Sequence, residues 1–149
     1  MPEAELERIF PRLRDEGYRL TSPIEIGQNC VSYAAGDAQR RWWDPFKPDG
    51  YWPDDLDRDD SIQTFVRLFE RMGFELCQDK NVEPDFEKVA IYGTTGTFGH
   101  VALQLPSGAW ASKLGELEDI EHQTLDGLIS VHYGYPVRYL RRKTAAGEV

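Results

Sequence analysis

The sequence predicts an α+β domain in which helices come first and a small antiparallel sheet follows. In the first half, apolar residues recur at helical spacing over 3–14 and 60–72. From about residue 86 the period changes to two, which is typical of strands. The 149 residues, of which 40% are hydrophobic, suffice for one core and are too few for two comfortable domains. We therefore expect a single domain over residues 1–149.

The first half predicts three helices separated by extended chain. Residues 3–14 form the first, although Pro11 favours a kink or an early end. Residues 17–26 read as an irregular or extended segment, and a short helix over 29–36 follows. The clearest helix is 60–72, with Asp60 as its N-cap.

The second half predicts a sheet with one late helix. Strands are expected at 74–77, 88–92, 100–105, 109–114 and 135–141, with turns at 93–99 and 106–108 and a helix over 117–128. The polar tail from about residue 142 is expected to fray.

Residues 40–60 form the most unusual segment of the chain. It contains Trp42, Trp43 and Trp52, three of the four tryptophans, among prolines and aspartates. Prolines and aspartates predict a long ordered loop. Two interpretations stay open: the rings pin the loop to the core, or they line a binding cleft with an acidic rim.

Charge and hydropathy exclude several classes of partner. The net charge of −9 argues against nucleic acid or an anionic membrane surface. No apolar stretch approaches the ~20 residues of a membrane span, and residues 1–14 lack the apolar core of a signal peptide. We expect a cytoplasmic protein with reduced thiols, and export by a machine that reads no N-terminal signal fits equally. No cofactor is expected.

Cys30 is the strongest candidate nucleophile. It lies in the first turn of the predicted helix, after Asn29 as N-cap. The positive end of the helix dipole favours the thiolate, which is the reactive form. The alternative is a small buried apolar residue beside Val31 and Tyr33. Cys77 lacks an activating neighbour and is expected to pack only.

His100 is the candidate base. It begins a strand in which His100, Ala102 and Gln104 share one face, whereas Val101 and Leu103 point to the other. A Cys30 helix packed across the first face would bring the thiol and the imidazole together. Such a pair attacks a carbonyl carbon.

This order of features resembles a known superfamily. A cysteine in the first turn of a helix, a strand reading Gly99-His100-Val101-Ala102-Leu103, and a hairpin resemble the papain-like fold of NlpC-type cell-wall peptidases and CHAP amidases. The resemblance implies that Cys30 is the nucleophile and His100 the base of an amidase or peptidase. It also implies that a polar residue on the next strand orients the imidazole.

A second likeness extends over nearly the whole chain, to uncharacterised bacterial proteins, and implies no activity. The matching stretches are Asn29-Cys30-x-x-Tyr33-Ala34-x-Gly36-Asp37, Gln104-Leu105-Pro106-x-Gly108-x-Trp110-x-Ser112-Lys113-Leu114-Gly115 and Asp119-Ile120-x-His122.

The residue that orients His100 stays open. A two-residue turn at 107–108 would place Lys113 opposite Ala102, but lysine cannot accept the imidazole N–H. Ser112 would serve if the register slipped by one. We expect Asp119 or His122 instead, which share a helical face at i, i+3, and the alternative is an ordinary surface pair.

An oxyanion hole would combine the backbone N–H of Cys30 with a donor from Gln28 or Asn29. Two other functions compete with the hydrolase. A metal site of Cys30, His100, Asp119 and His122 has no recognised ligand spacing. A non-catalytic acidic protein that binds or neutralises a cationic protein partner is the serious rival.

Overall fold

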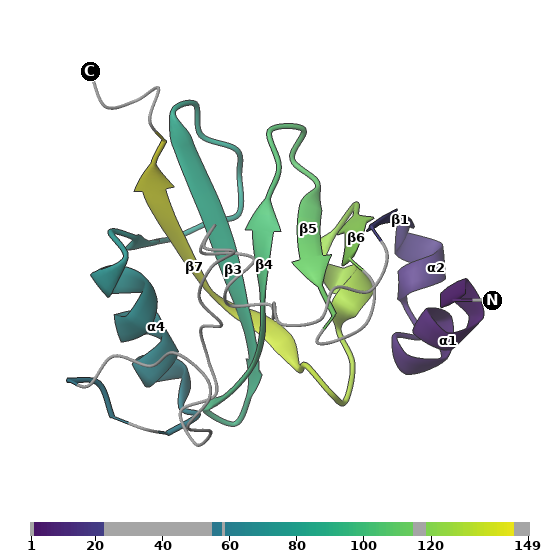
Figure 1. Ribbon diagram of the computed structural model, residues 1–149, viewed down its shortest axis with the longest axis horizontal. Helices are drawn as coiled ribbons and strands as arrows, with labels where there is room; N and C mark the ends of the chain where they lie inside the picture. Colours follow the sequence, from purple (N-terminus) through teal and green to yellow (C-terminus); the bar gives the residue numbers. More distant parts are fainter. Residues whose placement is uncertain (1, 23–54, 58, 115–118, 145–149) are drawn as a thin grey trace.

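The computed structural model describes residues 2–22, 55–57, 59–114 and 119–144. Within these residues a seven-stranded antiparallel sheet dominates, in the order β1-β6-β5-β4-β3-β7-β2 (Figure 1). Its strands are β1 (Tyr18–Ser22), β2 (Glu75–Cys77), β3 (Phe86–Thr94), β4 (Thr97–Gln104), β5 (Trp110–Lys113), β6 (Asp119–His122) and β7 (Tyr135–Lys143). The helices are α1 (Pro2–Ile9), α2 (Leu13–Glu16), α4 (Ile62–Arg71) and the 3-10 helix η1 (Leu125–Leu128).

The predicted fold class is therefore wrong. We expected N-terminal helices, one carrying Cys30, packed on a small papain-like sheet, whereas the described residues form a seven-stranded antiparallel sheet with a few short helices. Two segments account for much of the difference. Residues 93–99 extend β3 and β4 on either side of a turn at Thr95 and Gly96, and residues 119–122 form β6 rather than a helix. The predicted Cys30 helix lies outside the described residues.

The sheet has a hydrophobic core on each face. Helix α4 packs on one face, where its Phe65 ring stacks on Phe98 with centroids 3.8 Å apart. We call this the α4 core; its buried members are Ile62, Phe65, Val66, Leu68, Phe69, Phe74, Val89, Ile91, Phe98, Val101 and Leu140. The second, N-terminal core contains Leu6, Phe10, Leu13, Ala90, Tyr92, Ala102, Trp110, Leu114, Ile120, Leu125 and Leu128. The two lists share no residue because alternate side chains of a strand point to opposite faces.

Helix α4 and the two N-terminal helices lie close to where local signals place them. Helix α4 is capped by Ser61, whose Oγ accepts the Thr64 N–H at 3.2 Å, one residue after the predicted cap Asp60. The predicted helix over 3–14 divides into α1 and α2 around Pro11, which supplies no backbone donor. Both helices lie at the β1 end of the sheet (Figure 1). None of the described helices is long and apolar enough to cross a lipid bilayer.

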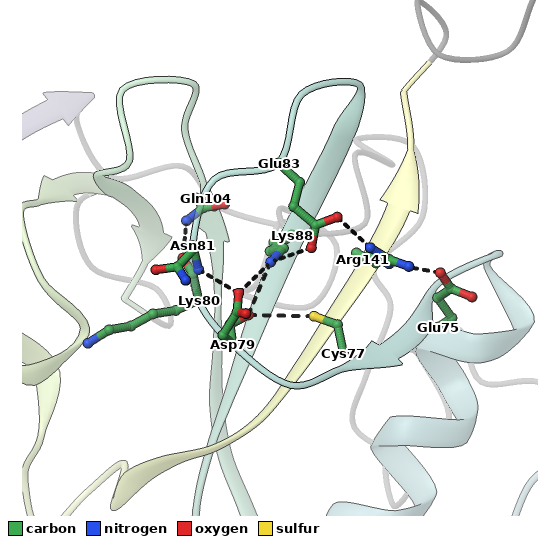
Figure 2. A network of polar contacts seen from close by, with 9 residues as sticks. All are labelled: Glu75, Cys77, Asp79, Lys80, Asn81, Glu83, Lys88, Gln104 and Arg141. Carbon is green, nitrogen blue, oxygen red and sulfur yellow. Dashed lines mark hydrogen bonds and ion pairs between the residues drawn. The ribbon is translucent and has the colours of Figure 1, made fainter.

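The segment between β2 and β3 is held by a buried ammonium group (Figure 2). Lys88 has no exposed surface, and its Nζ lies 3.1 Å from Asp79 Oδ1 and 2.9 Å from Glu83 Oε1. Glu83 also pairs with Arg141, which in turn pairs with Glu75. Because both carboxylates belong to the connecting segment, these contacts fix it to strands β3 and β7 (Figure 2).

A β-bulge at Gly99 sets the orientation of the residues that follow. Tyr92 pairs with His100 and Gly93 pairs with Phe98, so Gly99 is the extra residue on β4. A Cβ at Gly99 would lie 2.2 Å from the carbonyl oxygen of Tyr133. Glycine is therefore required here, because the 133 backbone packs directly against β4.

Replacing Gly99 with alanine is expected to lower the free energy of unfolding by about 1–3 kcal/mol, since a new methyl group would displace the 133 backbone. Chemical denaturation followed by circular dichroism measures this change. Gly127→Ala is the matched control, because a Cβ there would meet its nearest atom at 3.4 Å. Equal stabilities of the two variants would contradict the close approach.

Candidate functional site

His100 lies on the face of β4 that carries the N-terminal core, as its alternation with Val101 predicts. Its side chain is 0% exposed. The ring of Tyr133 stacks on the imidazole with centroids 4.2 Å apart and planes at 4°. Neighbouring side chains, Tyr133 among them, therefore cover the ring.

A chain of hydrogen bonds leads from His100 across three strands. His100 Nε2 lies 3.0 Å from Ser112 Oγ on β5, and Ser112 Oγ lies 2.7 Å from His122 Nε2 on β6. His122 Nδ1 lies 2.8 Å from the Thr124 carbonyl oxygen. All three side chains are 0% exposed. We call His100, Ser112, His122 and the Thr124 carbonyl the relay.

Ser112 reaches His100 because of the register between β4 and β5. Leu103 pairs with Ala111, which differs by one residue from the register of a two-residue turn. The hairpin instead closes with Leu105 N–H bonded to the Ala109 carbonyl, leaving a three-residue loop. Gly108 takes φ +94° in this loop, a conformation that glycine adopts without strain. The slipped register, in which Ser112 meets the imidazole, is therefore the one found.

The acceptor at the end of the relay fixes the direction of every proton in it. The Thr124 carbonyl can only accept a hydrogen bond, so His122 Nδ1 carries the hydrogen. In the neutral ring, His122 Nε2 then bears a lone pair. Ser112 must then donate its hydroxyl hydrogen to His122 and accept from His100 Nε2–H. His100 Nε2 is thus protonated, and His100 Nδ1 bears a bare lone pair.

The other ring nitrogen of His100, Nδ1, takes no part in the relay. Among the described residues it is the only buried side-chain nitrogen or oxygen without a hydrogen-bond partner. Burying a nitrogen without a hydrogen bond lowers the free energy of unfolding by about 1–3 kcal/mol. The presence of this nitrogen in the core therefore calls for an explanation. The nitrogen is a base whose partner would have to be a donor.

Burial keeps both histidines of the relay neutral. It lowers the pKa of His100 well below its usual value, and the nearby His122 lowers it further. Burial also lowers the pKa of His122 to about 4, opposed by its bond to the Thr124 carbonyl. At pH 7 the relay therefore carries no charge, and the His100 lone pair is available.

Asp119 and His122 do not share a face. On strand β6, Asp119 pairs with Lys113 and His122 pairs with Trp110, two different steps of the ladder. Residues three apart in a strand point to opposite faces, so the expected i, i+3 helical pair is wrong. Asp119 Oδ1 bonds the buried Lys113 ammonium at 3.3 Å. His122 thus serves in the relay through Ser112, and Asp119 does not belong to it.

Several predicted site residues lie outside the described residues. These are Cys30, Gln28, Asn29, Trp42, Trp43 and Trp52. Their proposed roles as nucleophile, oxyanion donors and cleft wall stay predictions. Cys77 is described: its Sγ–H donates to the Asp79 carbonyl at 3.6 Å, and burial raises its pKa. A raised pKa disfavours the thiolate, which agrees with a packing role.

Two residues of the site were not found by sequence reasoning. Tyr133, which stacks on His100, lies between the predicted helix and the last predicted strand and has no predicted role, and Thr124 falls within the predicted helix over 117–128. A signal for Tyr133 existed in Gly99 and Gly134, since glycines at both places permit close backbone approach.

Among the described residues, the cluster around Lys88 contains no buried polar side-chain atom without a hydrogen-bond partner. Lys88 bonds two carboxylates and the Asp79 carbonyl (Figure 2), which explains its burial without a ligand. Over the described part of the chain, no three His, Cys, Asp or Glu side chains gather closely enough to hold a metal ion. The four-residue metal set includes Cys30 and so stays untested.

Comparison with known proteins identifies a family and no activity. Residues 19–141 match the family model described as a domain of unknown function, DUF7689. No curated protein and no solved structure matches the chain. The likeness to NlpC-type peptidases and CHAP amidases stays a prediction. Because the match covers most of the sequence and includes all the relay residues, the chain belongs to the DUF7689 family.

Proposed function

We propose that this protein is a cysteine hydrolase that cleaves an amide or peptide bond by acyl transfer. The Cys30 thiol gives its proton to His100 Nδ1, and the sulfur attacks the substrate carbonyl. His100 then protonates the leaving amine, which departs and leaves a thioester. His100 then deprotonates a water molecule, which attacks the thioester, and the departing thiolate takes that proton back from His100. The carboxylic acid product loses its own proton to solvent.

One observation carries this proposal: the buried lone pair on His100 Nδ1, opposite a nitrogen whose hydrogen is committed to Ser112. A general base needs a fixed tautomer with its basic nitrogen unoccupied. The relay supports both conditions. A thiol S–H is the donor that the chain offers at Cys30, and the amide or peptide substrate follows from the chemistry of a thiol nucleophile.

The proposed reaction does not depend on a papain-like fold. Nucleophile and base recur on unrelated folds, and they are recognised by geometry. The oxyanion donors remain the Cys30 N–H with Gln28 or Asn29, and Trp42, Trp43 and Trp52 are the proposed cleft wall. We assign the reaction to the cytoplasm, where thiols stay reduced, and it uses no cofactor.

A second function is favoured by the burial of His100. Because the ring is 0% exposed, a substrate reaches Nδ1 only after covering side chains such as Tyr133 move. If they do not move, the chain is the non-catalytic alternative, an acidic protein that binds a cationic protein partner. The net charge of −9 favours such a partner.

The two functions differ in the reactivity of Cys30. With the hydrolase, iodoacetamide at pH 6.5 alkylates Cys30 far faster than Cys77, as mass spectrometry of the two peptides measures. His100→Gln keeps a donor for Ser112 but removes the base, so Cys30 labelling is expected to slow by roughly 100-fold. The rate at Cys77 should not change.

Ser112→Ala is the companion variant, because it frees the His100 imidazole to rotate and change tautomer. We expect its rate of Cys30 alkylation to lie between those of wild type and His100→Gln. Slow and equal labelling of both thiols in folded wild-type protein would overturn the hydrolase. In that case a pull-down complex that Cys30→Ala leaves intact would support the binding protein.

A further inference from the structure

Tyr133 is mounted rigidly over the imidazole of His100. Its backbone carbonyl packs against Gly99, where a Cβ would lie 2.2 Å away. The next residue, Gly134, has φ +78°, and a Cβ there would lie 2.3 Å from the Gly93 carbonyl oxygen. Two bonds close the turn: Tyr133 N–H to Ser130 Oγ at 3.2 Å and Gly134 N–H to the Ser130 carbonyl at 2.8 Å.

The ring of Tyr133 is held from two further sides. The Phe10 ring lies with its centroid 5.0 Å away at 42°, and the Tyr92 ring lies 6.4 Å away at 55°. Tyr92 is itself fixed by its hydroxyl, which donates to the Leu125 carbonyl at 2.6 Å. The near-parallel stack on His100 is therefore held in place by aromatic rings of the N-terminal core.

From this geometry we propose that Tyr133 is a positioning residue for His100. Ser112 decides which nitrogen carries the hydrogen, and the Tyr133 ring fixes the plane in which Nδ1 points. A stacked aromatic face also attracts a cation, so it stabilises the imidazolium that forms when the thiol gives up its proton. The role rests on the proposed hydrolase, but the fixed plane exists whether or not Cys30 reacts.

The test compares Tyr133→Leu, which removes the ring, with Tyr133→Phe, which keeps it. Tyr135→Leu is the matched control, because Tyr135 is 58% exposed and two residues away. Tyr133→Leu is expected to slow Cys30 alkylation about five- to tenfold, and Tyr133→Phe is expected to slow it less because the ring remains, whereas Tyr135→Leu keeps the wild-type rate. Nitrogen-15 spectra of labelled histidine report the imidazole independently: His100 should show one tautomer in wild type and exchange between environments in Tyr133→Leu.

The two readouts separate the possible failures. A single wild-type-like His100 tautomer and an unchanged rate in folded Tyr133→Leu would overturn the role of Tyr133. If Cys30 is unreactive in every protein including wild type, the hydrolase fails, and the histidine spectra alone decide on Tyr133. Should Tyr133→Leu not fold, Tyr133→Met fills the same space with a flexible chain and gives the same comparison.

Discussion

Acidification from pH 7 to pH 4 is expected to destabilise this protein by several kcal/mol through the two histidines of the relay. Burial lowers the pKa of His122 from 6.5 to about 4 and that of His100 well below 6.5. Below pH 6.5 these two histidines therefore bind protons in the unfolded chain but not in the folded one. Their full contribution to the free energy of unfolding is present above pH 6.5 and is lost as the pH falls towards 4. At about 1.4 kcal/mol per pKa unit, His122 alone accounts for a loss of unfolding free energy on the order of 3 kcal/mol between pH 7 and pH 4.

Urea denaturation at half-unit pH steps measures this dependence. Between pH 6.5 and 5 the carboxylates are still ionised, so the slope there belongs mainly to histidine. Replacing both His100 and His122 with glutamine is expected to flatten that slope. His132→Gln, which removes an exposed histidine and leaves the relay intact, should keep it. A steep slope that survives the double replacement would contradict the neutral relay.

Replacing Asp119 with leucine is expected to cost about 3–5 kcal/mol of unfolding free energy. Lys113 is 0% exposed, and its ammonium lies 3.3 Å from Asp119 Oδ1 on the neighbouring strand. Without that carboxylate, the positive charge of Lys113 stays buried and loses the counter-charge of Asp119. Thermal or urea denaturation of Asp119→Leu against wild type measures the loss.

The double variant Lys113→Met/Asp119→Leu removes both charges and is expected to recover most of the lost stability. Glu121→Gln supplies the matched control on the same strand, since its cross-strand partner Arg19 is exposed and such pairs contribute little. A single variant as stable as wild type, or a double variant as unstable as the single, would show that this pair is not buried as described.

Local signals were enough for the elements whose partners lie nearby in sequence. Helix α4 was predicted from its apolar stripe, and the hairpin of β4 and β5 from alternation around Gly108. The face of His100 also followed from alternation. These features depend on short-range periodicity and turn chemistry, which a sequence displays directly.

The parts that failed depend on long-range pairing. Residues 119–122 are four residues with no period of their own, and they are a strand because β5 pairs with them on one side and β1, about 100 positions earlier, on the other. The identity of the orienting residue turned on a register difference of one residue, and that shift exchanges Lys113 for Ser112. The relay joins three strands, so no single stretch of sequence contains it.

The proposed reaction requires that His100 present a bare Nδ1 lone pair to the Cys30 thiol. Nitrogen-15 spectra of histidine-labelled protein at pH 7, recorded for wild type and Cys30→Ala, test it most directly. The account predicts a neutral His100 protonated on Nε2, whose Nδ1 resonance shifts when the thiol is removed. A hydrogen on Nδ1, or spectra that are identical with and without the thiol, would contradict it.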